Sequence, residues 1–493
     1  MSTQFRPVRL KIPAVAAAAV VLGLLSPLGA TILTLDKALE IAFKNSPSIQ
    51  EARFSLTTSG ENLKAQQAGL KSQFLLTLTP VTLSETRAFS DLTSRYNTQE
   101  LTRSALRFSI TQPIKWTDGS LSLVDSFNWQ KAASSYTGSV AESTFNNSLT
   151  LRLTQPLFTY NRTQMTIRQL ELALENSQIN YALQKLSIER QVTQQFLNLY
   201  AAWEGLKIAE EELKNATESR QIIESKVQAG LAAPVELYQA DLTRLSSLAG
   251  LENQQMSYQN SLDGFKILLG LPFTEEIEIA ADIRKKLVEV DLDKAVEHAQ
   301  ANRMELRQRD ISIRNALDSL IRAEAENEFK GSIELSLGLT GVNRQIQSLY
   351  ESSNTDKQVS VSFNIPVFDW GQKTHRIAAT QASVDAQRLT AGELRKQITS
   401  EIRQACRNLQ NQKRQIEIVE TNVKNAQQTY EINLERYKNG DLSSKDMQFY
   451  QLQLSQQKLN EVQALISYKL AVLDLKIRSL YDFENNRSIV DQL

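Results

Sequence analysis

The sequence predicts an α+β membrane protein: mostly very long coiled-coil α-helices, with a smaller set of β-strands long enough to cross a bilayer. Three observations predict this class. Residues 161–229 and 370–439 contain no proline, and glycine (17) and proline (10) are scarce throughout the 493 residues. Shorter segments alternate apolar and polar residues, which is the period of a strand. The same plan of elements also occurs twice along the chain.

The charge balance argues against a nucleic-acid partner. Lys+Arg and Asp+Glu each number 55. Three of the positive residues, Arg6, Arg9 and Lys11, precede the first apolar run, so the chain without them has a net charge of 52 − 55 = −3. Phosphate backbones require a basic surface, and this balance does not supply one.

Residues 1–30 read as a signal peptide for export. The basic stretch precedes an apolar run at 14–25, and Ser-Pro-Leu-Gly-Ala follows at 26–30, with Leu28 in place of the small residue that is usual before a cleavage site. This run is shorter than the about 20 residues that a membrane-spanning helix needs, although an uncleaved N-terminal anchor is the alternative. No later stretch is apolar for long enough. We therefore expect an exported protein whose membrane crossing, if it has one, is a β-barrel.

An internal repeat organises the rest of the chain. The residues 35–38, Leu-Asp-Lys-Ala, recur at 292–295, an offset of 292 − 35 = 257. Pro156 matches Pro366, and Gly230 matches Gly440, both at an offset of 210. The difference, 257 − 210 = 47, predicts a 47-residue insertion in the first repeat between residues 74 and 155.

Each repeat opens with helices, expected at 31–73 and 292–331. Asp36 and Asp293 are expected N-caps, and Pro47 interrupts the first helix. The segment 74–158 then carries four alternating runs, with a tight turn at 115–119 and long polar connections at 84–103 and 130–145. The segment 332–367 carries two such runs as a hairpin. Short turns on one side and long loops on the other are typical of outer-membrane barrels.

Very long helices follow the strands in both repeats. In the first repeat the long helix and its return helix occupy 159–272, and a linker covers 273–291. In the second they occupy 368–484, and 485–493 form a C-terminal tail. Apolar residues recur with the 4-3 spacing of a coiled coil. Gly230 and Gly440 end the two long helices, about 100 Å from the strands at 1.5 Å per residue.

This ordered plan resembles the TolC-like outer-membrane efflux duct family. The resemblance rests on the segments 35–42, 155–158 and 365–371 and on the two glycine tips, and it covers residues 34–484. It implies a homotrimer in the outer-membrane lipids, with one shared transmembrane β-barrel and a periplasmic tunnel. It also implies a periplasmic adaptor protein and an inner-membrane pump of RND or ABC type as partners. Smaller members contribute four strands per protomer, whereas this sequence reads as six, and Asn161 stands where the corner of the second repeat has Gly371.

The resemblance also supplies candidate site residues. Tyr437 and Asp446 match two positions of the family's periplasmic gate, whereas Leu442 and Phe449 depart from two others. Asp446 is otherwise an ordinary polar residue of the return helix. The candidates for adaptor docking are the residues of the two tips: Ala229, Gly230, Asn439, Gly440 and Asp441.

The residues themselves offer no enzyme, metal or cofactor site. The single cysteine, Cys406, excludes a disulfide framework and is expected to be a packing residue. His298 and His375 share no ligand spacing and are expected to be unpaired. The function that we expect is a passive exit duct of a tripartite efflux or type I secretion system. The alternative is a non-conducting structural coiled-coil protein, and the exported substrate cannot be read from the sequence.

Overall fold

A computed structural model describes residues 31–91, 94–134, 142–280, 286–351 and 353–490 of the chain. The expected signal peptide at 1–30 lies outside the described residues. None of the helices within the described ranges has the length and apolar character needed to span a membrane.

The helices and strands of the described residues have the following bounds. The helices are α1 Leu35–Asn45, α2 Pro47–Gly69, α3 Arg162–Gln228, α4 Pro234–Leu269, α5 Leu292–Asn302, α6 Met304–Glu324, α7 Gln372–Asn439 and α8 Ser444–Ser479, with a 3-10 turn at Ile346–Ser348. The strands are β1 Thr31–Leu33, β2 Gln73–Ser90, β3 Arg95–Ile114, β4 Gly119–Ser134, β5 Glu142–Leu157, β6 Ile277–Ile279, β7 Lys330–Asn343, β8 Asn354–Asn364, β9 Tyr481–Asp482 and β10 Arg487–Ser488.

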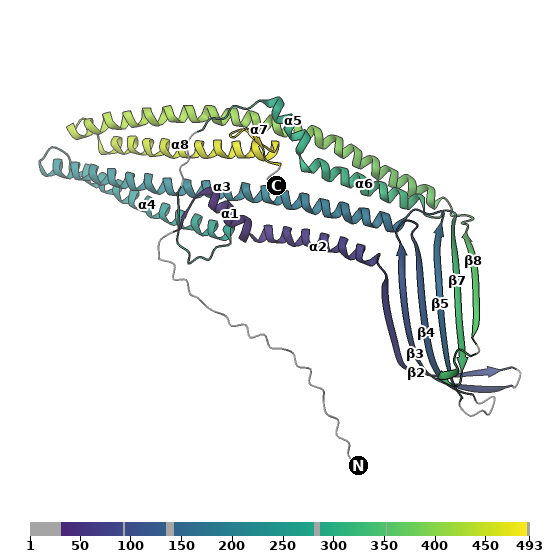
Figure 1. Ribbon diagram of the computed structural model, residues 1–493. Coiled ribbons are helices and arrows are strands. Elements are labelled where there is room, and N and C mark those ends of the chain that lie inside the picture. The colour runs from purple at the N-terminus through teal and green to yellow at the C-terminus, as the bar shows by residue number, and fades with distance from the viewer. Residues whose placement is uncertain (1–30, 92–93, 135–141, 281–285, 352, 491–493) are drawn as a thin grey trace, which may run out of the picture.

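The helices form an elongated body in which α3 pairs with α4, and α7 pairs with α8 (Figure 1). With 67 and 68 residues, α3 and α7 are each about 100 Å long at 1.5 Å per residue. Buried apolar residues hold each pair together, and a third cluster, containing Ile223, Tyr430 and Met447, joins the two pairs near their far ends. The two hairpins are therefore packed together at the end that lies away from the sheet.

The N-caps of the first helices are not the residues that the sequence predicts. Thr34 caps α1 by accepting a hydrogen bond from the Lys37 amide, and Asp291 caps α5. Asp36 and Asp293 instead lie inside the first turns, because a cap residue must have an extended backbone and precede the helix. There their carboxylates still favour the positive end of the helix dipole.

Six strands form one antiparallel sheet in the order β2-β3-β4-β5-β7-β8, which leaves β2 and β8 as edges. The strands are longer than expected. The connection predicted at 84–103 is mostly strand, because β2 and β3 remain paired along their whole length. Gln73 pairs with Thr111 at one end, and Ser90 pairs with Arg95 at the other. The connection predicted at 130–145 is shortened in the same way by β4 and β5, and residues 135–141 lie outside the described part. Polar residues at these strand ends conceal the alternation from a reading of the sequence.

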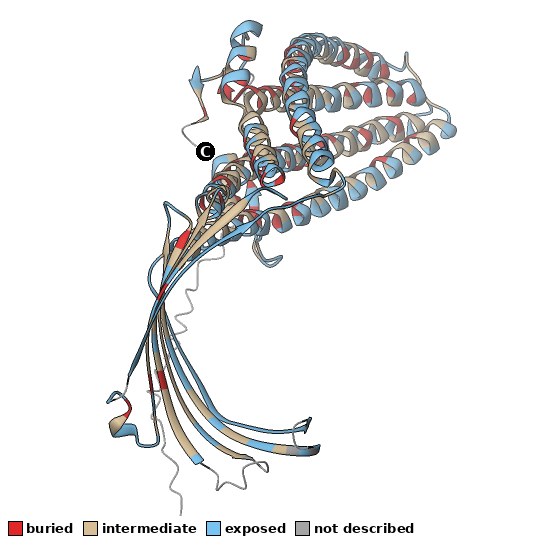
Figure 2. Cartoon of the chain, turned by 90° about the vertical axis from the view of Figure 1, so that its right-hand side faces the viewer, coloured by how far each residue is buried: buried red, intermediate tan, exposed pale blue. Residues whose placement is uncertain are grey.

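The register gives the sheet one apolar and one polar face, because directly paired residues point to the same side. One row across five strands is apolar throughout: Phe74, Ile110, Leu123, Leu151 and Leu337. A row on the opposite face is polar throughout: Thr77, Arg107, Ser126, Ser148 and Thr340. Asp125 interrupts the apolar face in the middle of β4. Burial is concentrated in the helices, whereas the strands are mostly exposed or intermediate (Figure 2).

The joints between strands and long helices are held by short side chains. Asn161 caps α3 by accepting from the Gln164 amide at 2.8 Å, and its own amide group donates to the carbonyls of Lys115 and Trp116. Thus the asparagine that departs from the Gly371 pattern acts as a helix cap. At the second joint, Asp369 accepts from the amides of Gly371 and Lys373, and these hydrogen bonds lower its pKa. In Figure 1 the strands run steeply across the helix axes at these joints.

Candidate functional site at the helix tips

The two helix hairpins turn at glycines whose backbones are left-handed. Gly230 has a φ of 72° and Gly440 a φ of 91°. A Cβ in this region is unfavourable, which accounts for glycine at both turns. In both, the residue after the glycine donates its amide to a carbonyl of the last helical turn: Leu231 to Lys226 at 2.8 Å, and Asp441 to Arg436 at 2.9 Å.

The remaining docking candidates lie on these turns and are exposed. Ala229 follows the last residue of α3, Asn439 is the last residue of α7, and Asp441 follows Gly440. Leu231, next to the first glycine, is 79% exposed although it is apolar. The tips thus present an accessible surface at the end of the helical body that lies away from the sheet.

Tyr437 is buried where the two hairpins meet. Its side chain is only 1% exposed. Its hydroxyl donates to the Ser219 carbonyl on α3 at 3.2 Å and lies 3.2 Å from the Ser444 hydroxyl on α8. Burial raises the pKa of the Tyr437 phenol, so it remains protonated and able to donate. The tyrosine therefore connects its own hairpin to the other one.

Two charged side chains of the first hairpin complete this connection. The Lys226 ammonium on α3 donates to the Tyr437 carbonyl at 2.5 Å, at the C-terminal end of α7. The Glu236 carboxylate on α4 accepts from the Ser444 amide at 2.9 Å, at the N-terminal end of α8. The positive Lys226 thus lies at the negative end of the α7 dipole, and the negative Glu236 lies at the positive end of the α8 dipole, which strengthens both hydrogen bonds. We call Ser219, Lys226, Glu236, Tyr437 and Ser444 the tip cluster.

Asp446 occupies a different position from Tyr437. It lies in the first turn of α8, where its amide donates to the Ser443 hydroxyl at 3.2 Å and its carboxylate accepts from that hydroxyl at 2.7 Å. Ser443 is thus the N-cap of α8, and the Asp446 carboxylate holds its hydroxyl in place, so Asp446 has a local structural role. Its side chain is also exposed at the tip. Among the described residues, no hydrogen bond connects the Asp446 side chain to the tip cluster.

Further contacts join the hairpins along α3 and α8. The Lys458 ammonium lies 2.6 Å from the Glu211 carboxylate, and the Gln451 amide group donates to the Glu212 carbonyl at 2.7 Å. Sequence reasoning missed Lys226, Glu236 and these contacts. Their partners are more than 200 positions away along the chain. Taken alone, Lys226 and Glu236 read as favourable charges near the ends of their own helices.

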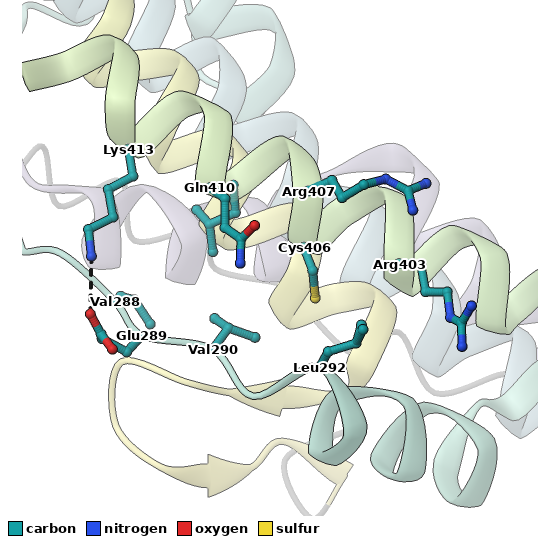
Figure 3. A pocket seen from close by; sticks show the side chains of 10 residues that line it. Val288, Glu289, Val290, Leu292, Arg403, Cys406, Arg407, Gln410 and Lys413 are labelled. Carbon is teal, nitrogen blue, oxygen red and sulfur yellow. Dashed lines mark hydrogen bonds and ion pairs between the residues drawn. The ribbon is translucent and has the colours of Figure 1, made fainter. Parts of the chain in front are cut away.

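A groove of about 440 Å³ lies between α7 and the chain before α5 (Figure 3). Cys406 faces it from the buried side, and burial raises the pKa of its thiol, so the cysteine acts as a packing residue. Lys413 and Glu289 form an ion pair of 3.1 Å across the groove. The structure places this groove far from the tip cluster, near the middle of α7.

The two histidines differ from each other. His375 is exposed in the first turn of α7. His298 was expected to be unpaired, but it stacks on Tyr481 with ring centroids 4.3 Å apart, because the C-terminal segment folds back onto α5. Within the described ranges no group of three His, Cys, Asp or Glu side chains could hold a metal ion.

The long paired helices and the attached two-faced sheet define a class of protein, and comparisons with known proteins identify it. A model of the outer membrane efflux protein family matches residues 120–271 and 293–477. No curated protein matches the chain. Solved structures with the same fold include the Campylobacter jejuni CmeC outer membrane channel, with 16% identity, a TM-score of 0.68 and coverage of 97% of this chain and 94% of that one.

Two further solved structures share the fold. The outer membrane protein VceC of Vibrio cholerae has 16% identity and a TM-score of 0.66, covering 90% of this chain and 95% of that one. The open state of the Neisseria gonorrhoeae MtrE outer membrane channel has 14% identity and a TM-score of 0.64, covering 90% and 88%. The chain belongs to the outer membrane efflux protein family, so it is an outer-membrane protein with a role in efflux.

Proposed function

We propose that the chain is the passive exit duct of a tripartite efflux or type I secretion system, and that it works as a homotrimer across the outer membrane and periplasm. A periplasmic adaptor protein and an inner-membrane pump of RND or ABC type are the partners. The observation that carries this proposal is the six-stranded sheet with two free edges, joined to two helix hairpins of about 100 Å.

The free edges support assembly into a shared barrel. Six strands are too few for a closed barrel, for which eight is about the minimum. If β8 of one protomer pairs with β2 of the next, three protomers give 3 × 6 = 18 strands. The alternative of 12 strands would leave the inserted pair outside the wall. The continuous hydrogen bonding of β2 and β3 with the other strands favours 18.

The two faces of the sheet fit a barrel wall. In a closed barrel the apolar rows would contact lipid and the polar rows would line a water-filled lumen. Such a wall also satisfies the backbone groups of β2 and β8, which a single protomer leaves exposed at the edges. A non-conducting structural protein would have no need of a polar inner face.

An exposed apolar seam on α4 supports lateral packing of the helices. Val235, Tyr238, Leu242 and Leu245 follow the 3-4-3 spacing of a coiled coil and are between 51% and 68% exposed. A neighbouring protomer is the occupant that the trimer would supply. The same assembly would bring six glycine tips together at the periplasmic end as the docking surface for the adaptor, and Asp446 would remain a candidate for the constriction.

A homotrimer should be observed when the protein is extracted in mild detergent and its mass is measured. It should also conduct ions when placed in planar bilayers, because the polar face would enclose water. A stable monomer in native membrane extract would contradict the trimer. A trimer without conductance would favour the structural alternative.

The orientation of the sheet in the membrane can be tested with single cysteines, after Cys406 is replaced by serine. Asp91→Cys, at the end of β2 far from the helices, should react with a thiol reagent that does not cross membranes. Trp116 lies in the turn beside α3, and its side chain is 82% exposed. Trp116→Cys should react only after the cells are opened. The reverse pattern would refute the proposed orientation. Asp118, in the same turn, is less suitable for a cysteine substitution, because its carboxylate accepts a hydrogen bond from the Thr163 amide that the substitution would remove.

A further inference from the structure

The hairpin β2–β3 is the extra pair of strands in the first half of the chain. The family match begins at residue 120, just inside β4, so β2 and β3, like α1 and α2, lie before it. The helices α5 and α6 are followed by two strands only, whereas α1 and α2 are followed by four. Without β2–β3 the sheet would contain four strands, and its edge would be β4. The hairpin therefore adds two strands to the sheet, and its side chains add to both faces of that sheet.

Two arginines of β3 lie on the polar face. Arg107 pairs with Thr77 on one side and Ser126 on the other. Arg103 pairs with Thr82 and Gln130, and its guanidinium donates through Nε and Nη2 to the Asn128 carboxamide oxygen at 3.2 and 2.6 Å. Both arginines are exposed, and each is flanked within its row by uncharged residues.

The other charged side chains described on the polar face balance these arginines only in part. Arg152 and Glu334 form an ion pair of 3.1 Å, and Arg344 and Glu142 form one of 2.8 Å near the far end of the strands. Asp356 on β8 lies opposite Gly338 on β7, and it is the acidic residue of this face that remains outside these two ion pairs at a similar height. Apart from Lys330, where β7 begins near the helices, the described middle of the face thus carries 2 − 1 = +1 per protomer, or +3 in a trimer.

We propose that Arg103 and Arg107 form a cationic belt inside the barrel that favours the passage of anions, so that the exported molecules carry carboxylate, phosphate or sulfate groups. This inference rests on the proposed duct. Guanidinium groups bind such oxyanions through paired hydrogen bonds, and rings of arginine in a pore select for anions. The Asn128 carboxamide positions Arg103 without neutralising its charge.

The test is the reversal potential of the purified full-length trimer in planar bilayers under a KCl gradient. The double variant Arg103→Gln/Arg107→Gln should lower the anion-to-cation permeability ratio by about two-fold or more. Arg103→Lys/Arg107→Lys should retain the ratio of the wild type. Asp356→Asn should shift the ratio the other way. The control is Lys131→Gln, which removes one positive charge next to Gln130 but on the apolar face, and it should change nothing.

A conducting double glutamine variant with an unchanged ratio would overturn the belt while leaving the duct intact. An equal shift in Lys131→Gln would also overturn the belt, because the effect would then not depend on the face. Absence of conductance in the wild-type trimer is a different result, since it would overturn the proposed duct and the belt together.

Discussion

Replacing both Lys226 and Glu236 by methionine should leave the protein assembled in the membrane but should increase the open probability of the reconstituted channel. Both side chains bridge the first hairpin to the second, at the Tyr437 carbonyl and the Ser444 amide. The buried Tyr437 hydroxyl would keep its contacts with Ser219 and Ser444, so the hairpins would be loosened at the tip without being unfolded. We expect the tips to separate more often because the cost of separation falls.

The size of this effect follows from the bonds that are lost. A hydrogen bond to a charged group contributes about 1.5–3 kcal/mol when it is partly protected from water. Each lost contact should therefore shift the balance of closed and open tips by roughly ten-fold or more. Single-channel recording measures the open probability, and uptake of a large dye by whole cells gives an independent readout.

Lys438→Met is the matched control for this variant. Lys438 also lies in the last turn of α7, but its ammonium pairs with Glu435 on the same helix at 2.7 Å. Lys438→Met removes a positive charge, as Lys226→Met does, without breaking a contact between hairpins, so its open probability should equal that of the wild type. Equal gating in the double variant and the wild type would show that the tip cluster does not hold the channel closed.

Gly440→Val should yield trimers in the membrane that export poorly. The backbone at Gly440 has a φ of 91°, where a β-branched side chain is strained by about 1–2 kcal/mol. Space is not the obstacle, because the nearest atom to an added Cβ is the Lys226 Nζ at 3.8 Å. The turn would move, and with it the exposed docking residues and the tip cluster. Export should fall by roughly ten-fold if docking uses this turn.

Two variants separate the turn from other effects. Gly440→Asn should retain most of the export, since asparagine accepts the left-handed backbone better than valine. Gly392→Ala lies in the middle of α7, where nothing approaches within 4 Å, and should leave export unchanged. Normal export by Gly440→Val would show that this tip is not the docking site.

The helices could be predicted closely from local signals. The return helix expected within 159–272 is α4, Pro234–Leu269, which Pro234 starts and Gly270 stops with a φ of 70°. The second return helix was expected to continue to 484, but α8 ends at Ser479. There the backbone of Leu480 turns left-handed and the chain forms the β9–β10 hairpin. The strands β9 and β10 pair with each other, and the periodicity of α8 does not predict this pairing.

The six strands of the large sheet were predictable in number but not in length. Alternation locates a strand where one face is apolar, and it disappears where both faces carry polar residues, as at the far ends of β2 and β3. Those ends are paired because the strands continue a register that is set in the apolar region. Backbone hydrogen bonding extended the elements where the side chains gave no signal.

By itself, the sequence determined the local features of this protein: the long helices, the glycine turns, the number of strands and the alternation within them. These depend on neighbours within a few residues, so periodicity and breakers disclose them. Only the tertiary structure decided which partners meet over long separations. It brought Lys226 to Tyr437 and Glu236 to Ser444. It also placed Arg103 and Arg107 on the polar face, because the strand register rather than the identity of a residue determines the side to which it points.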